Sequence, residues 1–227
     1  MFRYETHLHT YPVSRCARAT AEETVDFYKA KGYDGIFITN HFLDGNINMD
    51  TDEPYEKLIR FYFSDYHAAR ERGEKIGLKV FPGVELSYKG TDFLVYGLDE
   101  KWYLAHPEIE YMRKSEELTL MRLAGALIIQ AHPFREDPWI DHIRLFPRQV
   151  EGVEVNNAGQ TDFRNRMAAL YAGEYGLLPF AGSDNHVAGR NKRLAGIELE
   201  ESVGSVRDFI AAIRAGTYTI FSEEIAG

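Results

Sequence analysis

Residues 35–41 read Gly-Ile-Phe-Ile-Thr-Asn-His (GIFITNH), an apolar run that is followed directly by Asn40 and His41. The run over 35–39 contains β-branched and aromatic residues and predicts a short buried strand. Runs of this kind alternate with helical patterns along most of the chain, which is typical of βαβ units around a parallel sheet. The sequence therefore predicts an α/β fold with His41 at the carboxyl end of a strand.

The alternation of strand and helix patterns continues without an internal repeat, a low-complexity tract or a linker. Thr20 begins a capping box with Glu23, and Gly216 stops an amphipathic helical segment. We expect one domain, residues 1–227, folded as a closed or nearly closed β/α barrel of seven or eight units. The expected strands cover 2–9, 35–39, 79–86, 92–98, 127–129, 152–155, 178–181 and 217–221, and the expected helices about 20–32, 55–66, 107–124, 162–175 and 206–213.

Composition limits the classes of function. The chain is 44% hydrophobic and 27% charged, and no apolar run approaches the roughly 18 to 20 residues that span a bilayer, so we expect no membrane partner. A formal net charge of −9 would repel a phosphate backbone, so nucleic acid is not an expected partner. The single cysteine, Cys16, forms no internal disulfide, and the first residues lack the features of a secretory signal, which together indicate a cytoplasmic location.

Unusual polar residues lie at the predicted carboxyl ends of the strands. His7 and His9 are one residue apart, so in a strand their imidazoles point to the same face. Asp184 and His186 repeat this spacing after another strand. Because the strand ends of a β/α barrel converge on one mouth, we expect a metal-binding cluster there. Its expected members are His7, His9, His41, Glu85, His132, Asp184 and His186, whereas His67, His106 and His142 lie in helical or loop segments and are expected to be solvated.

Five short motifs occur in order along nearly the whole chain and carry these residues. Together they resemble the PHP (polymerase and histidinol phosphatase) family, whose members are distorted seven-stranded β/α barrels. The resemblance implies a TIM-barrel-like (β/α)7 fold, two or three divalent metal ions, and hydrolysis of phosphate esters. The motifs are HLHT (7–10), ITNH (38–41), PGVELS (82–87), AHP (131–133) and GSDNH (182–186).

The resemblance also implies roles for individual residues. Glu85, Asp184 and His186 would be catalytic through metal-activated water, with Glu85 bridging two metals. Imidazole and carboxylate ligands suit zinc, manganese or iron. Carried over by motif, the ligands are His7, His9, Glu85 and Asp184 for a first metal, Glu85 and His132 for a second, and His41 and His186 for a third.

Three positions depart from the family pattern. Asn40 stands where the family usually has an aspartate, so a group behind the ligands loses its charge. Many members supply a further ligand from the loop after the first motif, and here the nearest candidate is Cys16, either a thiolate ligand that would favour zinc or iron or an ordinary buried cysteine. Asp99 stands where many members have a histidine after the fourth strand, and is either a further ligand or a turn residue.

Four arginines beside the motifs are candidates for binding a phosphate group. Two metals about 3.5 to 4 Å apart lower the pKa of a shared water and stabilise the attacking and leaving oxygens of a displacement at phosphorus. We therefore expect a metal-dependent phosphoesterase that acts on a small phosphorylated substrate, most simply a phosphomonoester. The candidate arginines are Arg15, Arg18, Arg135 and Arg190, with Arg135 and Arg190 the stronger pair.

Two other interpretations stay open. Amidohydrolase-type C–N hydrolases also begin with His-x-His after the first barrel strand, but their pattern usually adds a bridging lysine and a final lone aspartate. A non-enzymatic, metal-stabilised binding module is the second alternative, as in PHP domains that support a polymerase. Neither the leaving group nor the oligomeric state follows from the sequence, because the visible motifs bind metal and phosphate only.

Overall fold

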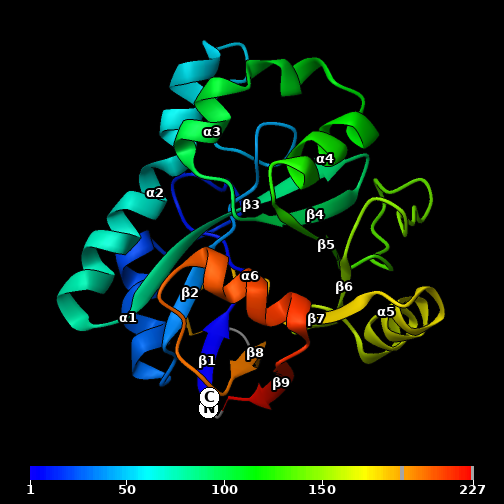
Figure 1. The fold of residues 1–227 in the computed structure, drawn as a ribbon. Coiled ribbons are helices and arrows are strands. Elements are labelled where there is room, and N and C mark those ends of the chain that lie inside the picture. Colours follow the sequence, from blue (N-terminus) through cyan, green and yellow to red (C-terminus); the bar gives the residue numbers. More distant parts are fainter. Residues whose placement is uncertain (190–191, 226–227) are drawn as a thin grey trace.

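The computed structural model describes residues 1–189 and 192–225, and these form a single nine-stranded sheet that curves into a nearly closed barrel (Figure 1). The order of strands is β7-β6-β5-β4-β3-β2-β1-β8-β9. The α/β class and the distorted barrel are thus confirmed, with more strands than expected. The strands are β1 (Phe2–Glu5), β2 (Gly35–Ile38), β3 (Lys79–Tyr88), β4 (Thr91–Tyr96), β5 (Leu127–Ala131), β6 (Gly152–Asn157), β7 (Leu178–Gly182), β8 (Arg193–Leu199) and β9 (Tyr218–Glu224).

The strands do not all run in the same direction, which corrects the expectation of a parallel sheet. β1, β2 and β3 are parallel to one another, and so are β5, β6 and β7. β4 is antiparallel to both of its neighbours, because Lys89 and Gly90 adopt positive φ values of 52° and 82° and reverse the chain after β3. β8 is antiparallel to β1 and β9. The carboxyl ends of β1, β2, β3, β5, β6 and β7 therefore still lie at one end of the barrel, which forms the mouth.

The barrel closes at this mouth. Just beyond β1, Leu8 forms a parallel bridge with Asn185, which follows β7. The amide of His9 donates to the carbonyl of Asn185 at 2.9 Å, and the amide of Asp184 donates to the carbonyl of His7 at 2.8 Å. These contacts place the motifs HLHT (7–10) and GSDNH (182–186) side by side.

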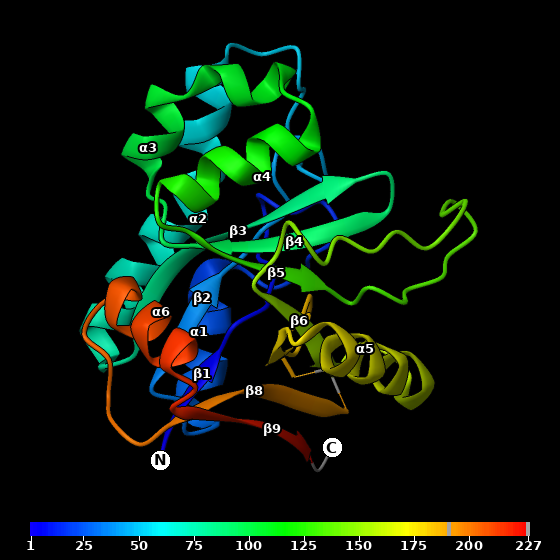
Figure 2. The same ribbon diagram turned by 45° about the vertical axis from the view of Figure 1, so that its right-hand side comes forward.

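The helices follow the expected order, and their ends agree with the local sequence signals. Thr20 and Glu23 form the predicted capping box of the first helix, and Gly216 ends the last one with a φ of 71°. Helices α3 and α4 lie above the β3–β4 hairpin (Figure 2). The helical elements are α1 (Ala21–Ala30), α2 (Tyr55–Ile76), α3 (Glu100–Ala105), the 3-10 helix η1 (Pro107–Tyr111), α4 (Lys114–Leu123), α5 (Asp162–Tyr175) and α6 (Val206–Ala215).

Two elements, β8 and α3, are not anticipated by the sequence patterns. β8 reads RLAGIEL, with charged residues near both ends and Gly196 in the middle. The glycine is required there, because a Cβ at this position would lie 2.3 Å from the carbonyl oxygen of Tyr4. The expected helix over 107–124 is divided into η1 and α4, because Met112 and Arg113 adopt extended backbone conformations.

The opposite end of the barrel is filled by apolar side chains. The ring of Phe209 on α6 lies 4.6 Å from that of Phe37 and 6.3 Å from that of Tyr96, measured between centroids. Ile210 packs against Gly97, which follows β4 at this end. α6 therefore plugs one end, and the buried polar residues gather at the other. Among the described residues, no helix has the length and apolar character needed to cross a membrane.

Candidate metal centre

All seven predicted ligands meet at the mouth. His7 and His9 follow β1, His41 follows β2, Glu85 lies within β3, His132 follows β5, and Asp184 and His186 follow β7. Two of these residues have unusual backbones: φ is 24° at His132 and 52° at Asp184. Such conformations cost about 1 to 3 kcal/mol each in non-glycine residues and are held only where the surroundings fix them.

Glu85 lies at the centre of the cluster and is fully buried. Its Oε2 atom lies 2.6 Å from Nδ1 of His41, and its Oε1 atom lies 3.1 Å from Nε2 of His7 and 3.3 Å from Nε2 of His132. Within the described part of the chain, neither carboxylate oxygen has a hydrogen-bond partner, nor has Nδ1 of His41. Buried polar atoms that lack hydrogen-bond partners are costly, and a cation bound between the carboxylate and the imidazoles would satisfy them, so the donor set fits bound cations.

Asp184 faces the same space from β7. Its Oδ1 atom lies 3.3 Å from Nε2 of His9 and 3.5 Å from Nε2 of His7, and its Oδ2 atom lies 3.8 Å from Nε2 of His132. Together with Glu85 it supplies two negative charges among five imidazoles. A donor set of this kind suits transition metals such as zinc, manganese and iron.

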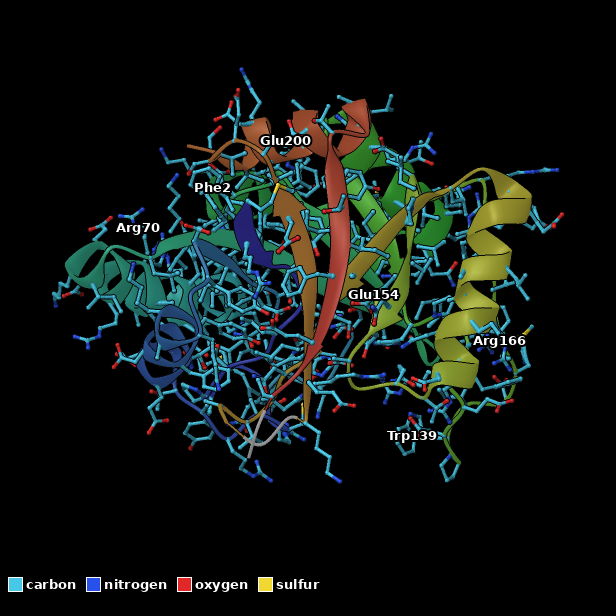
Figure 3. The ribbon with its side chains drawn as sticks, turned by 90° about the horizontal axis from the view of Figure 1, so that it is seen from below. Phe2, Arg70, Trp139, Glu154, Arg166 and Glu200 are labelled. Carbon is cyan, nitrogen blue, oxygen red and sulfur yellow. The ribbon has the colours of Figure 1, made fainter. Side chains whose placement is uncertain are left out.

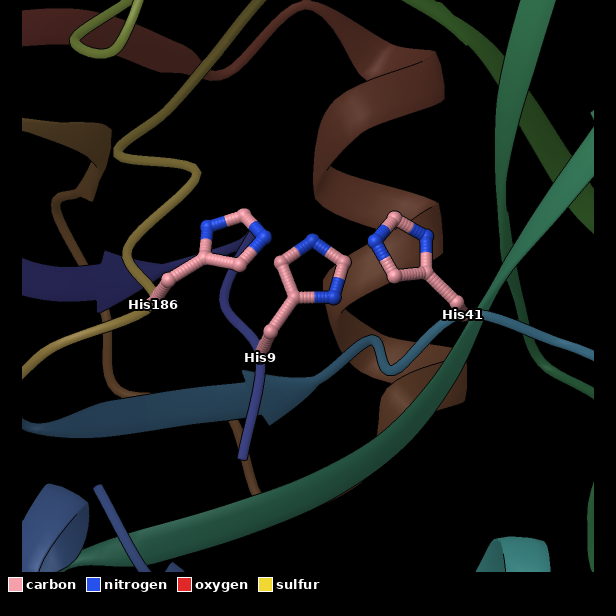
Figure 4. Close-up of side chains that lie close together, drawn as sticks. All are labelled: His9, His41 and His186. Atoms are coloured by element: carbon pink, nitrogen blue, oxygen red, sulfur yellow. The ribbon is translucent and has the colours of Figure 1, made fainter. Parts of the chain in front are cut away.

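The donor atoms form three overlapping sets, and in each set they lie within 4.8 Å of one another. In the set formed by His9, His41 and His186, the ring of His9 lies between the other two rings, with 4.2 Å between ring centroids on either side (Figure 4). The sets share His7 and His9, and one imidazole nitrogen binds one metal at a time. They are His7–Glu85–His132, His7–His9–Asp184 and His9–His41–His186.

Hydrogen bonds behind the ligands fix the direction of two imidazoles. Nδ1 of His7 lies 3.0 Å from Oε1 of Glu154, so this nitrogen donates and Nε2 keeps its lone pair for the mouth. Nδ1 of His9 lies 3.3 Å from the hydroxyl of Ser14, which itself donates to Oδ1 of Asn40 at 2.8 Å. His9 must therefore donate through Nδ1 and also presents Nε2 to the mouth.

Sequence reasoning missed Glu154 and Asp92. Glu154 is a buried charge inside an apolar strand, a signal that would have marked it as needing a partner. It also accepts from the amide of His132 at 3.1 Å, and Gly182 lets it approach His7, because a Cβ there would lie 2.9 Å from Oε1. Asp92 is the second residue of β4, and its Oδ2 atom lies 3.9 Å from Nε2 of His132.

Asp99 is not part of the centre. Since β4 is antiparallel, its first residues lie at the mouth and its last residues point to the opposite end. Asp99 is exposed and caps α3, where its Oδ1 atom accepts from the amide of Trp102 at 2.9 Å. Asp92 is the carboxylate that β4 brings to the mouth.

The carboxylate of Asp65 lies behind Asn40. Its amide nitrogen donates to the hydroxyl of Thr10 at 2.9 Å and points toward Oδ2 of Asp65 at 3.4 Å. Asp65, on α2, also accepts from the hydroxyl of Thr10 at 2.7 Å and from the amide of Val13 at 3.2 Å. The negative charge that position 40 lacks is therefore present one hydrogen bond further back.

The electrostatics of the cluster favour ionised carboxylates and a neutral His9. Burial raises the pKa values of Glu85 and Asp184, but the facing imidazoles outweigh it and hold the pKa of both carboxyls well below their usual range. Burial, together with the neighbouring His41 and His186, holds the pKa of His9 well below its usual range. Both carboxylates are thus ionised and His9 is neutral.

Cys16 lies at the edge of this cluster and is partly buried. Burial raises the pKa of its thiol, but contacts with His186 and His41 outweigh this effect and lower the pKa to about 6. Both histidines belong to the third donor set. The structure thus brings Cys16 to the mouth.

The centre opens into a cavity of about 600 Å³, within the range of small-molecule sites. Arg135 lines it; its Nη1 atom lies 3.5 Å from Oδ2 of Asp92, and its Nε atom lies 2.6 Å from Oδ2 of Asp137. The guanidinium also lies over the ring of Trp139, 5.5 Å from its centroid. Figure 3 shows Glu154 in the middle of the molecule and Trp139 at its edge.

The other predicted arginines are not brought together with Arg135. Arg15 and Arg18 are exposed and do not line this cavity, and the guanidinium of Arg18 donates to the carbonyls of Arg15 and Ala17. The expected clamp of four arginines is therefore corrected to Arg135 within the described residues, because these two side chains point to the surface of the loop after β1. Arg190 lies outside the described residues.

Comparison with known proteins supports the fold. No family model and no curated protein matches the sequence. A solved structure from Bacteroides vulgatus, a two-domain protein containing a predicted PHP-like metal-dependent phosphoesterase, has a TM-score of 0.68 at 16% identity and covers 97% of this chain. The match covers 64% of that protein, so this chain spans less than two thirds of its length.

Two further solved structures share the fold. The lesion-specific endonuclease PfuEndoQ from Pyrococcus furiosus has a TM-score of 0.59 at 12% identity over 96% of this chain and 57% of its own. An amidohydrolase from Chromobacterium violaceum has a TM-score of 0.58 at 14% identity over 92% of this chain and 96% of its own. At such identities the likeness shows the fold alone. The resemblance to PHP-like proteins that the motifs indicate is therefore confirmed as a likeness of fold.

Proposed function

We propose that the chain is a metal-dependent hydrolase of phosphate esters, and that its substrate is a small phosphomonoester. The observation that carries this proposal is Glu85, whose two buried oxygens face four imidazole nitrogens without a hydrogen-bond partner among the described residues. A carboxylate in this position is suited to bridging two cations. Bound metals would supply a water of lowered pKa and would offset negative charge at phosphorus.

The ligand assignment follows from which nitrogens are already used. Because Nδ1 of His7 and Nδ1 of His9 are committed to hydrogen bonds, each of these residues offers only Nε2. If both bind the metal that Asp184 holds, a second metal takes Glu85 and His132. His41 and His186 are then left for a third, and Cys16 is the group beside them that completes this set. We propose zinc, manganese or iron as the metals.

The substrate is held by residues of this chain at the rim. Arg135 is kept in place by Asp92 and Asp137 and offers the remaining guanidinium hydrogens to a phosphate group. His186 has 28% of its side chain exposed, the most among the ligands, and is the histidine that the substrate meets first. A net charge of −9 disfavours a long polyanion, whereas one arginine beside the metals is sufficient for one phosphate.

The alternative functions, an amidohydrolase, a nuclease or a binding module, differ from the proposed one in the residues or the activity that they require. The bridging lysine that the amidohydrolase pattern usually adds has no counterpart in the metal cavity, since none of the described residues lining it is a lysine. A nuclease activity is an outcome to be tested, because one protein of similar fold is a lesion-specific endonuclease. A binding module would retain metal without turnover.

The proposal is tested by a substrate panel on metal-quantified protein. Phosphomonoesters, phosphodiesters, single- and double-stranded DNA, and amide substrates are compared after loading with zinc, manganese or iron. We expect at least two metal ions per chain and the highest kcat/KM on a small monoester. Arg135→Ala should raise KM for that ester, with Arg18→Ala as the matched control. Faster cleavage of DNA, release of ammonia, or the absence of bound metal would each reject the proposal.

A further inference from the structure

A second cavity of about 520 Å³ adjoins the metal cavity. It lies between the segment after His41, the end of β3, and the η1–α4 region. Asp44 and Ser87 line both cavities, so the two share a wall. Six of its lining residues are apolar, namely Phe42, Leu43, Tyr88, Ile109, Met112 and Phe146.

The shared wall is a continuous chain of polar contacts. Nζ of Lys114 lies 2.6 Å from Oε2 of Glu117 and 2.5 Å from Oδ2 of Asp44. The other oxygen of Asp44 accepts from the amide of Ser87 at 2.9 Å, and the hydroxyl of Ser87 donates to Oδ1 of Asp92 at 2.7 Å. Asp92 in turn contacts Arg135. The contacts fix the boundary between the apolar cavity and the residue proposed to bind phosphate.

The charges of the second cavity exclude an anion. Its two cationic side chains, Lys114 and Arg113, are already paired with carboxylates, Lys114 with Asp44 and Glu117 and Arg113 with Glu116. Glu110 adds a further carboxylate to the lining. A second phosphate or a carboxylate would therefore meet apolar groups and negative charge.

We propose that this cavity holds the leaving group of the substrate, and that the leaving group is an uncharged apolar alcohol with an aromatic or branched aliphatic body. The proposal rests on the proposed phosphoesterase function. The volume of the cavity falls in the range that encloses small ligands, and Asp44 and Ser87, which line both cavities, place it next to the cavity of the metal centre and Arg135.

Three alkyl phosphates of similar intrinsic reactivity separate the possibilities: 2-phenylethyl phosphate, glycerol 3-phosphate and 3-phosphoglycerate. Hydrolysis of glycerol 3-phosphate tests the phosphoesterase function, and the preference for 2-phenylethyl phosphate tests whether the second cavity binds the leaving group. We expect kcat/KM to be about ten- to a hundredfold higher for the phenylethyl ester, because the ring is removed from water, and lowest for the anionic 3-phosphoglycerate.

Ser115→Trp is the variant that fills the cavity, because Ser115 is an exposed residue of α4 that lines it. We expect it to lower kcat/KM for the phenylethyl ester at least about tenfold and to leave glycerol 3-phosphate unchanged. Ser64→Trp, at an exposed serine of α2 outside both cavities, is the matched control. A binding readout is calorimetry with 2-phenylethylphosphonate, whose binding should show a negative heat-capacity change that Ser115→Trp removes.

The outcomes are distinguishable. A wild-type enzyme that hydrolyses glycerol 3-phosphate but shows no preference for the phenylethyl ester, or keeps the preference in Ser115→Trp, overturns the cavity assignment alone. A metal-loaded enzyme that hydrolyses none of the three esters overturns the phosphoesterase function and this inference together.

Discussion

Nδ1 of His41 lies 2.6 Å from Oε2 of Glu85, yet neither atom has a hydrogen-bond partner among the described residues. His41 and Glu85 also form a parallel β-bridge, so their backbones hold the two side chains in this position. The backbone thus keeps a buried imidazole nitrogen and a buried carboxylate oxygen face to face. We interpret this contact as part of a metal site, and the predictions below follow from it.

Glu85→Gln should remove the bridging charge while preserving the shape of the side chain. We expect kcat to fall by more than about 100-fold, beyond the 10- to 100-fold typical of changes behind the ligands, and at least one metal ion per chain to be lost. Elemental analysis and turnover measure this, with circular dichroism to check folding. Glu100→Gln is the control, because Glu100 pairs with His67 at the surface. Near wild-type turnover would remove Glu85 from the site.

Glu154→Gln should weaken the centre without removing a ligand. The amide oxygen can still accept from Nδ1 of His7, but it no longer supplies a negative charge behind that imidazole. We expect metal affinity or activity to fall about 10- to 100-fold. Glu151→Gln, three residues earlier and paired with Arg214, is the matched control. Metal affinities equal to wild type in a competition titration would show that Glu154 has only a structural role.

Cys16 should be reactive in chelator-treated protein and protected once metal is bound. Because its thiol pKa is lowered to about 6, the thiolate predominates at neutral pH, and the alkylation rate should fall only as the pH drops below about 6. As the single cysteine, it makes the iodoacetamide assay site-specific. Cys16→Ser should also lower metal occupancy. Equal alkylation rates with and without metal would mean that Cys16 is not a ligand.

Lys114→Met should lower stability in a pH-dependent manner. Burial lowers the pKa of Lys114, but Asp44 and Glu117 outweigh this effect and raise it above the ordinary value. The folded-state pKa therefore exceeds the unfolded one, so the ion pairs stabilise fully below the ordinary lysine pKa and are lost as pH rises through the folded pKa.

We expect Lys114→Met to lower the free energy of unfolding by about 3 kcal/mol at pH 8, since it leaves the buried Glu117 unpaired. The difference from wild type should shrink above about pH 10.5. Urea denaturation at several pH values measures it, with Lys57→Met, whose surface pair is with Glu53, as the control. A difference that stays constant up to pH 11.5 would contradict the assignment.

Much of the fold could be predicted because local signals were strong. The apolar run at 35–38 is fully buried as β2, and Thr20 and Gly216 cap helices as expected. β8 was missed because its apolar residues are interrupted by Gly196, whose purpose is a close approach to Tyr4 that only the folded sheet reveals. The split of the 107–124 segment likewise depends on two extended residues without a breaker in the sequence.

The predictions for the centre succeeded or failed according to strand direction. For strands that run toward the mouth, a polar residue at the carboxyl end marks the site, as with His132 after β5. β4 runs in the opposite direction, so its carboxyl end, which Asp99 follows, lies away from the mouth. The carboxylate at the mouth is Asp92, near the amino end of β4, and the sequence patterns did not indicate it. The direction of a strand in the sheet depends on which strands it pairs with, and this pairing cannot be predicted from one segment of the sequence alone.

The sequence by itself determined the chemistry: the types of ligand, their one-residue spacing in the pairs His7–His9 and Asp184–His186, and the repeated placement of polar residues after apolar strands. The tertiary structure alone decided which groups stand behind and beside them. Glu154 reaches His7 across 147 positions of chain at 3.0 Å, and Ser87 joins two cavities whose walls come from segments far apart in sequence. Bonding geometry is local and can be read from neighbouring residues, whereas hydrogen-bond partners and cavities arise only when distant strands pack together.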